Sequence, residues 1–310
     1  MTRPIFGLAH SMGAPQLLHA ALTHPRLFHA QILIEPVLYD AAPAPTVHGP
    51  VHGAVRRRDR WVDRDALEVY VRDSPLYRSW DPRCRDRWME YGVREVVGPI
   101  AMGGFDFGSG TGSGSGEHNT EVVLVTPRHQ EAFTLTRPVD GAVQRRKTPS
   151  SSSSSSSSAE LDLAIQRGAS KYPLMQAEPM VVFHNLGFLK PAVLFMYGEL
   201  SVFLKAGGLR ERAMERTGRG VLGSGGVNQG RVKREDIENA GHMAPVEQPA
   251  VIARKAGGWI AREVQRWEED LRRVEGEWKG KTGEERRMLD EEFLDGLGLG
   301  EKEKKMMMKL

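Results

Sequence analysis

Cysteine is almost absent from the sequence, since Cys84 is the only one among 310 residues. A single thiol excludes a disulfide framework within the chain and is typical of a reducing compartment. The first residues also lack the basic and then apolar pattern that directs secretion. We therefore expect a cytoplasmic protein. The last three residues, Met308-Lys309-Leu310, resemble a peroxisomal address with Met in place of the small first residue, so the peroxisome is the alternative.

Long apolar runs and a strong charge of one sign are missing as well. No stretch of about 18 apolar residues occurs, so we predict no membrane-spanning helix. The formal net charge is only +3 and the basic residues are scattered, which argues against a nucleic-acid partner. Histidines, cysteine and carboxylates do not cluster at ligand spacing, and the glycine-rich run 223–226 lacks the lysine and strand context of a phosphate loop. The sequence therefore predicts neither a metal nor another cofactor.

The beginning of the chain has the pattern of a strand, a turn, a helix and a second strand. Pro4–Ala9 and Gln31–Ile34 are short apolar segments, and Pro36 ends the second of them. Between them, Met12–His24 is rich in Ala and Leu and predicts a helix. Two such strands joined by a helix imply a parallel pair with a crossover connection. This pattern favours an α/β fold.

The middle of the chain is less regular. Asp63–Trp88 carries aromatic residues at irregular helical spacing and predicts two or three helices of a cap. Glu121–Val125 predicts a short strand or an extended segment. The Gly/Ser run 103–116 and the unbroken serine run 150–158 have the composition of flexible linkers. We interpret the whole region as a helical cap inserted into the α/β fold.

Regular patterns return after the serine run. Pro191–Tyr197 and Arg231–Glu238 predict buried strands, and Leu209–Thr217 predicts a helix between them. Pro249–Trp278 predicts a long amphipathic helix. The residues beyond it are highly charged and predict a helical or disordered tail. The sequence thus predicts a sheet of about four parallel strands.

Ser11 has the setting of a nucleophile elbow. The residues Ala9-His10-Ser11-Met12-Gly13 lie between a predicted strand and a predicted helix, and residues two before and two after the serine are small. Such a turn exposes the serine hydroxyl at the helix N-terminus, where the N–H of Met12 is a predicted oxyanion donor. The alternative is that Ser11 only caps the helix. The strand before it and the helix and strand after it favour the nucleophile.

Several strings together resemble α/β-hydrolases. They are His10-Ser-Met-Gly, Thr23-His-Pro-Arg-Leu-Phe, Leu33-Ile-Glu-Pro, Gly223-Ser-Gly-Gly and Gly241-His-Met-Ala-Pro-Val-Glu-Gln-Pro. More narrowly, the sequence is similar to fungal serine hydrolases of the toxin-biosynthesis type and to peroxisomal lipase-like hydrolases. The resemblance covers residues 1–265. It implies a nucleophile, an acid and a histidine in that chain order.

His242 is the candidate general base. It follows the last predicted strand and precedes a helix, which is the place that the resemblance gives to the catalytic histidine. Imidazole suits the role because it can take up and return a proton near neutral pH. His10 adjoins the serine, but we assign it to the scaffold of the elbow. The other histidines lie in predicted surface or cap segments.

The acid is the least regular member of the predicted triad. Related hydrolases have Gly-x-x-Asp after the penultimate strand, whereas this chain has Gly198-Glu-Leu-Ser201. Serine cannot supply a fixed negative charge. Glu35 closes the strand that follows the elbow helix, and some α/β-hydrolases, including lactone-cleaving ones, resemble this in placing their acid there. We favour Glu35, with Glu199 as the alternative acid.

The resemblance also indicates what the chain lacks. An α/β-hydrolase sheet normally has eight strands with the elbow after the fifth, so the first four strands are expected to be missing here. With them goes the loop that supplies a second oxyanion donor. We therefore expect an incomplete, N-terminally truncated gene model, in which the first predicted strand is an uncovered edge.

These expectations combine into one organisation and one function. Residues 1–40 and 181–265 form the hydrolase core, 41–180 the cap and 266–310 the tail. The predicted function is a serine hydrolase that acts on an apolar carboxylic ester, lactone or thioester through an acyl-enzyme. Its predicted partner is this small-molecule substrate alone, and no pattern indicates an oligomeric state. The main alternative is a non-catalytic remnant of such an enzyme. A scaffold role of the charged residues 259–290 is a further alternative.

Overall fold

The fold is that of a computed structural model, which describes residues 3–41, 49–97, 120–136, 176–201, 208–289, 291–298, 300, 301 and 303. Both linker runs and the C-terminal tripeptide lie outside these residues. Contacts divide the chain into two units. One unit comprises residues 5–258. The other comprises residues 1–4 and 259–310. Each is described by itself.

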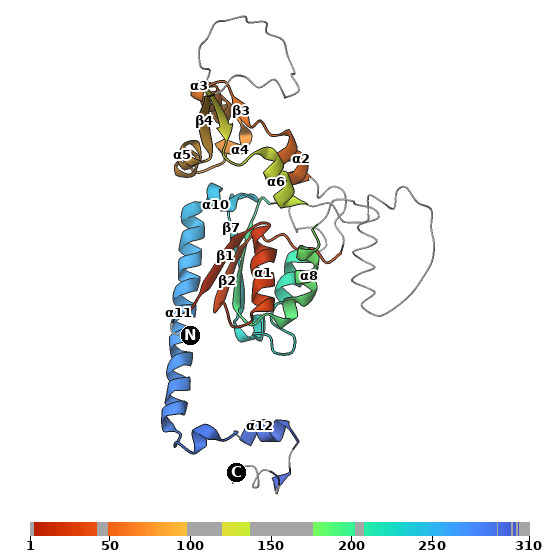
Figure 1. Ribbon diagram of the computed structural model, residues 1–310, viewed down its shortest axis with the longest axis vertical. Coiled ribbons are helices and arrows are strands. Elements are labelled where there is room, and N and C mark those ends of the chain that lie inside the picture. The colour runs from red at the N-terminus through yellow and green to blue at the C-terminus, as the bar shows by residue number, and fades with distance from the viewer. Residues whose placement is uncertain are drawn as a thin grey trace, which may run out of the picture. The chain divides into compact units, whose positions relative to one another are not determined.

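Four parallel strands form the main sheet, in the order β1-β2-β6-β7 (Figure 1). Their bounds are β1 Phe6–His10, β2 Ala30–Ile34, β6 Ala192–Gly198 and β7 Val232–Ile237. Every residue of β2 and β6 is buried, as expected for inner strands that are covered on both faces. The predicted α/β class and the parallel sheet are confirmed.

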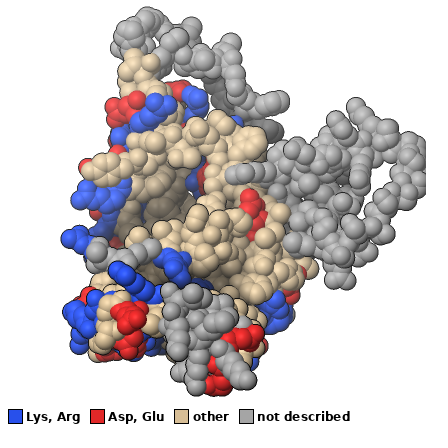
Figure 2. Space-filling model, turned by 60° about the horizontal axis from the view of Figure 1, so that its bottom comes forward, with Lys and Arg blue, Asp and Glu red and all other residues tan. Residues whose placement is uncertain are grey.

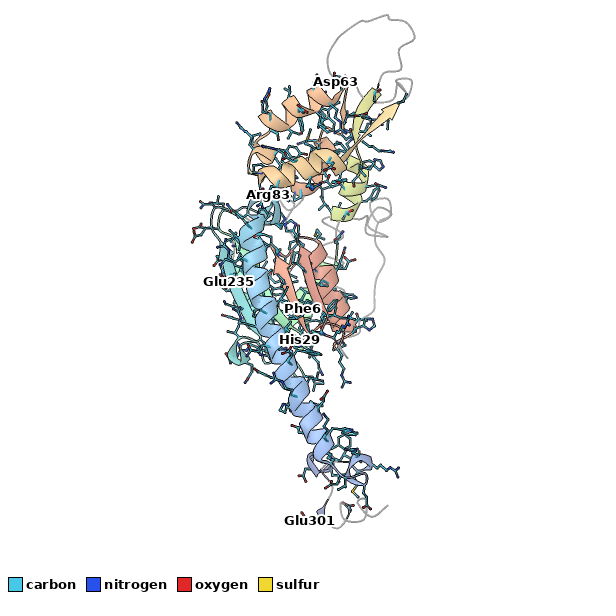
Figure 3. All side chains as sticks on the ribbon, turned by 90° about the vertical axis from the view of Figure 1, so that its left-hand side faces the viewer. Phe6, His29, Asp63, Arg83, Glu235 and Glu301 are labelled. Atoms are coloured by element: carbon cyan, nitrogen blue, oxygen red, sulfur yellow. The ribbon has the colours of Figure 1, made fainter. Side chains whose placement is uncertain are left out.

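The register brings the carboxyl ends of the strands to one edge of the sheet. His10 pairs with Ile34, and Ile34 with Met196. At the opposite edge, the rings of Phe6 and His29 lie 6.0 Å apart (Figure 3). Loops that leave the carboxyl ends of parallel strands therefore converge at the edge beyond His10 and Ile34.

One face of the sheet is covered by helices α1 Gly13–Thr23, α8 Glu178–Asn185 and α9 Leu209–Arg216. Leu18 of α1 and Phe183 of α8 share a buried cluster with Leu33 and Phe195 of the sheet. Helices α1 and α8 lie side by side in Figure 1. This cluster is the apolar core under the strand ends.

Between β2 and α8 the chain forms the cap. Its helices are α2 Gly49–Arg56, α3 Arg64–Asp73, α4 Pro75–Arg78, α5 Pro82–Tyr91 and α6 Arg128–Leu135. The predicted helices between Asp63 and Trp88 are present as α3, α4 and α5. An aromatic cluster fills their interior, with Tyr77 between Trp80 and Trp88 at ring separations of 5.0 and 4.6 Å.

The helical cap also contains strands, as the segment Glu121–Val125 indicated. A second, antiparallel sheet lies within it, in the order β3-β5-β4. Its strands are β3 Arg60–Trp61, β5 Thr120–Leu124 and β4 Val93–Val97. Trp61, Val93 and Val122 point into the aromatic cluster. These strands are short, and β3 and β4 contain the charged residues Arg60, Arg94 and Glu95, so only the segment at Glu121–Val125 gave a strand signal.

After β7 the chain enters the short helix α10 Ala244–Glu247 and the long helix α11 Pro249–Gly280. The part of α11 beyond Trp259, with the turn η5 Glu285–Arg287 and helix α12 Glu291–Gly296, belongs to the second unit. Pairs such as Arg273 with Glu277, 3.2 Å apart, line its surface.

No helix among the described residues is long and apolar enough to cross a membrane. On the face drawn in Figure 2, basic and acidic side chains are intermixed. The four predicted domain ranges stay a prediction.

The core predicts a clear contrast between two leucines on neighbouring strands. Leu33 is fully buried, whereas Leu8 on β1 is 59% exposed. We expect Leu33→Ala to lower the free energy of unfolding by about 3 kcal/mol, because it removes apolar contacts and leaves a cavity. Leu8→Ala is the matched control and changes it by less than about 0.5 kcal/mol. Urea unfolding followed by circular dichroism measures both. Equal effects would contradict the assigned register.

Candidate active site

Ser11 lies on a sharp turn between β1 and α1. Its φ of 53° is in the left-handed region, which a non-glycine residue adopts only where surrounding contacts impose it. Its N–H continues the strand ladder to the carbonyl of Ile34 at 3.0 Å. The tight approach of helix and strand occurs at Gly7, where a Cβ atom would lie 2.8 Å from the side chain of Leu17. This geometry presents the serine side chain at the helix start, as the elbow pattern predicts.

His242 reaches Ser11 from the loop between β7 and α10. The serine Oγ lies 2.8 Å from Nε2 of the imidazole. Asn239, with φ of 54°, turns the chain out of the strand, a conformation that asparagine tolerates. The loop then passes so close to β6 that a Cβ atom at Gly198 would lie 2.3 Å from the Gly241 carbonyl oxygen. Only glycine at position 198 allows this path.

Glu35 contacts the other side of the same imidazole. Its Oε2 lies 3.1 Å from Nδ1 of His242, and its side chain is only 1% exposed. The residue has φ of 48° and donates its N–H to the Met196 carbonyl at 2.8 Å. Glu199, the alternative acid, is exposed just beyond β6. The structure thus brings Ser11, His242 and Glu35 together in one line of contacts.

His10 holds the histidine loop from the neighbouring position of the elbow. Its Nε2 lies 2.7 Å from the carbonyl oxygen of His242, and the two rings are 5.1 Å apart. Burial lowers the pKa of the His10 imidazole below its ordinary value. The neutral ring donates one N–H, and the carbonyl accepts it. This contact links β1 directly to the loop that carries His242.

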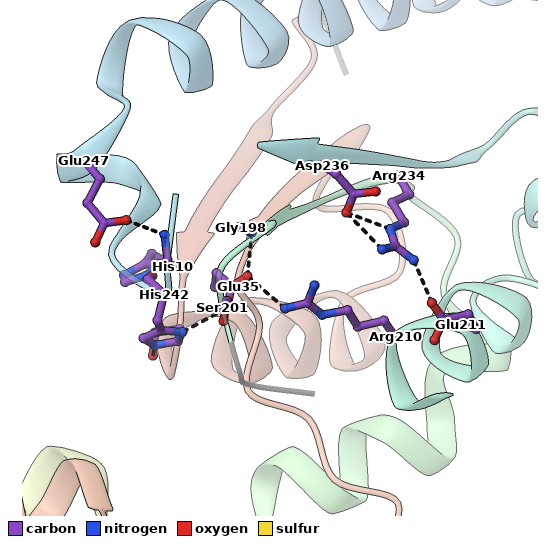
Figure 4. A network of polar contacts seen from close by, with 12 residues as sticks. His10, Glu35, Gly198, Ser201, Arg210, Glu211, Arg234, Asp236, His242 and Glu247 are labelled. Carbon is purple, nitrogen blue, oxygen red and sulfur yellow. Dashed lines mark hydrogen bonds and ion pairs between the residues drawn. The ribbon is translucent and has the colours of Figure 1, made fainter. Parts of the chain in front are cut away.

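Two further residues surround Glu35 (Figure 4). The sequence patterns did not indicate Arg210, and they marked Ser201 only as the residue in the place of the usual acid. Ser201 donates its hydroxyl to Oε2 at 2.5 Å. Arg210 of α9 lies 3.3 Å from Oε1, and its side chain is 3% exposed. The N–H of Gly198 also donates to Oε1, at 2.7 Å. A match of the Gly-x-x-Asp position with Ser201 was the only signal that pointed to this place.

A cavity of about 510 Å³ opens in front of Ser11. Its walls are mainly apolar and come from both the core and the cap, with Val37, Tyr39, Val51, Leu135 and Met243 among them. Met12 and His242 also line it, so the predicted oxyanion donor and the imidazole face the same space. A second cavity, of about 610 Å³, lies among α3, α4 and α5 and is lined by none of the site residues.

The cap contributes one ion pair to the cavity wall beside Ser11. Arg57, just after α2, and Glu131 of α6 lie 3.0 Å apart and are each about 30% exposed. Opposite charges in direct contact leave this part of the wall nearly neutral. The space therefore suits an apolar group next to a hydroxyl, an imidazole and a buried carboxylate. That combination can carry out nucleophilic acyl transfer.

Comparison with known proteins adds relatives of named activity. No family model matches the sequence. The type I acyl-CoA thioesterase mpaH of Penicillium roqueforti is 30% identical over 301 residues, which cover 93% of this chain and 63% of that protein. The chain thus spans less than two thirds of the length of this relative. The abhydrolase domain-containing protein ACTT2-1 of Alternaria alternata is 24% identical over 298 residues, which cover 96% of this chain and 98% of that protein.

Among solved structures, the peroxisomal α/β-hydrolase Lpx1 of Saccharomyces cerevisiae is similar, with a TM-score of 0.51 at 14% identity. The match covers 84% of this chain and 53% of that chain. At this identity the likeness concerns the fold alone.

Proposed function

Because the chain belongs to the α/β-hydrolase superfamily, we propose that it hydrolyses a carboxylic ester, lactone or thioester of an apolar acyl group. The observation that carries the proposal is the line of contacts from Ser11 through His242 to Glu35, at 2.8 and 3.1 Å. These are hydrogen-bond distances between a nucleophile, a base and the group that orients the base.

In the first half of the proposed reaction, Ser11 Oγ attacks the acyl carbonyl while Nε2 of His242 takes the hydroxyl proton. Glu35 accepts a hydrogen bond from Nδ1, which fixes the ring and stabilises the imidazolium that forms. The N–H of Met12, at the start of α1, is the proposed donor to the oxyanion. His242 then returns the proton to the departing alcohol or thiol, and the acyl group stays on Ser11.

In the second half, a water molecule gives its proton to Nε2 of His242 and attacks the acyl-enzyme. Collapse of the second tetrahedral intermediate releases the carboxylic acid and returns the proton to Ser11. The apolar wall of the cavity, formed by residues such as Val37, Val51 and Leu135, supports an apolar acyl group. Because the Penicillium roqueforti relative is named an acyl-CoA thioesterase, a thioester is the first substrate class to test.

The test is a rapid-mixing assay with p-nitrophenyl esters and with acyl thioesters of short, medium and long chains. An acyl-enzyme mechanism gives a burst of released product whose size equals the enzyme concentration, provided that deacylation is slow. Apolar chains that fill the cavity should react faster than acetyl. Absence of both burst and turnover with every member of the series would contradict the proposal.

A second proposal is a protein that keeps the site but does not turn substrate over. The observation that favours it is the edge position of β1, which pairs only with β2 among the described strands and exposes Leu8. The oxyanion typically needs a second donor in addition to the N–H of the residue after the nucleophile. Loss of one such donor lowers the rate by about 10²- to 10³-fold. In that case an apolar ester or its unreactive ether analogue binds in the cavity, but no product forms.

A further inference from the structure

We infer that Ser201 and Arg210 are positioning residues that hold the Glu35 carboxylate and set how strongly it attracts the imidazole of His242. The inference rests on the proposed function as far as turnover is concerned. Its structural part concerns only the pair of Glu35 and His242. Neither Ser201 nor Arg210 touches the reacting hydroxyl, so both would act through Glu35.

The four contacts to Glu35 divide evenly between its two oxygens. Oε1 accepts from the N–H of Gly198 and from Arg210, at 2.7 and 3.3 Å. Oε2 accepts from Ser201 and faces Nδ1 of His242, at 2.5 and 3.1 Å. A carboxylate has about four acceptor directions, so these contacts occupy all of them. The group is thereby held in one orientation, with Oε2 toward the imidazole.

Ser201 occupies the place where the Gly-x-x-Asp pattern has an acid. Here its hydroxyl donates to the acid of the neighbouring strand end rather than acting as an acid itself. The residue is 2% exposed, so water does not compete readily for this hydrogen bond. The serine therefore adds a donor at the same oxygen that His242 uses.

Arg210 supplies a permanent positive charge on the opposite side of the carboxylate. Its guanidinium is 3% exposed and lies 4.4 Å above the ring of Tyr197, which fixes its plane. A buried guanidinium is costly unless it is paired, and Glu35 is its ion-pair partner here. The carboxylate thus divides its attraction between a fixed cation and an imidazole that gains and loses a proton.

The charges around His242 set the direction of the expected effect. The titratable and charged groups that face it are Glu35 just after β2, the neutral His10 of β1, Glu247 of α10, which accepts from the Gly241 N–H at 2.6 Å, and the opposed pair Arg57 and Glu131 of the cap. Glu35 is the charged group in direct contact with the ring. Removal of the Arg210 charge leaves the carboxylate to attract the imidazolium alone, so His242 should keep its proton to a higher pH.

The test is a titration of the His242 ring by ¹⁵N-detected NMR in the full-length protein, which needs no turnover. We expect Arg210→Met to raise the pH at which His242 titrates by about one unit. Ser201→Ala removes one donor to the same carboxylate and should raise it by about half a unit. Arg212→Met is the matched control, because it removes an exposed arginine of the same helix that pairs with Asp40, and it should leave the titration unchanged.

Arg210→Lys keeps the charge and separates positioning from a general loss of structure. The His242 ring of Arg210→Lys should titrate near the wild-type pH, whereas that of Arg210→Met should titrate at a higher pH. If Arg210→Met fails to fold, Ser201→Ala and Arg210→Lys still decide the question, since Ser201→Ala deletes a single oxygen atom. Titration at the wild-type pH in Ser201→Ala and in any folded Arg210→Met would overturn the inference.

Kinetics give a second readout if the protein turns substrate over. Ser201→Ala and Arg210→Met should each lower kcat about tenfold with KM nearly unchanged, because the Glu35 carboxylate is no longer held in the orientation that aligns His242 for proton transfer in the transition state. The pH at which activity is half-maximal on the acid side should rise together with the NMR titration. An inactive wild-type protein would contradict the proposed function and leave the titration result standing on its own.

Discussion

Replacement of Ser11 with alanine lowers kcat by on the order of 10⁵-fold, with no comparable loss of stability. The hydroxyl is the only group of the site that can form the proposed covalent bond, and His242 Nε2 lies 2.8 Å from it. Enzymes of this kind lose about 10⁴- to 10⁶-fold when a member of the catalytic unit is removed. The measurement is hydrolysis of the best ester or thioester of the chain-length series.

Ser74→Ala is the matched control for this substitution. Ser74 precedes α4 in the cap, and its side chain makes no capping hydrogen bond there. The control should keep full activity and the same thermal midpoint. A Ser11→Ala variant as active as this control would mean that another group performs the reaction.

Glu35→Gln lowers kcat by about 10⁴-fold, the second largest expected effect. The amide is nearly isosteric with the carboxylate, but it carries no charge to stabilise imidazolium. Its NH₂ group can also face Nδ1 and favour the wrong tautomer of His242. Because four donors surround this position in the wild type, including Arg210, the substitution should also reduce stability.

Glu199→Gln is the isosteric control, and it decides between the two acids that the sequence left open. Glu199 lies exposed beyond β6, so the substitution should leave kcat/KM within about twofold of wild type. A larger loss in Glu199→Gln than in Glu35→Gln would reverse the assignment of the acid. Steady-state kinetics of both variants on one substrate is sufficient.

Sequence patterns predicted the parts of the fold that depend on short stretches of chain. The apolar strand before Ser11 and the Ala- and Leu-rich helix after it are local signals, and the turn between them places Ser11 in the left-handed region. Glu35 was favoured over Glu199 because it closes the strand after the elbow helix, where some α/β-hydrolases place their acid. The four parallel strands therefore agree with the pattern of apolar segments.

Other features depend on contacts between distant residues, which no local pattern reveals. Arg210 lies in a helix with several other charged residues, and only the fold turns it toward Glu35, 175 positions away. The cap sheet pairs Val93 with Leu124 across a long interval of sequence. Its two-residue strand β3 is too short to give a periodic signal. Such contacts are set by the tertiary fold and not by local propensity.

The most direct measurement is peptide mapping by mass spectrometry after treatment with a fluorophosphonate, which reacts with serines that an adjacent base has activated. The Ser11–His242–Glu35 arrangement predicts one phosphonyl group per chain, located on Ser11 and lost in His242→Ala. Labelling on a different residue, or an unmodified Ser11 in folded protein, would contradict the central claim that this turn carries an activated nucleophile.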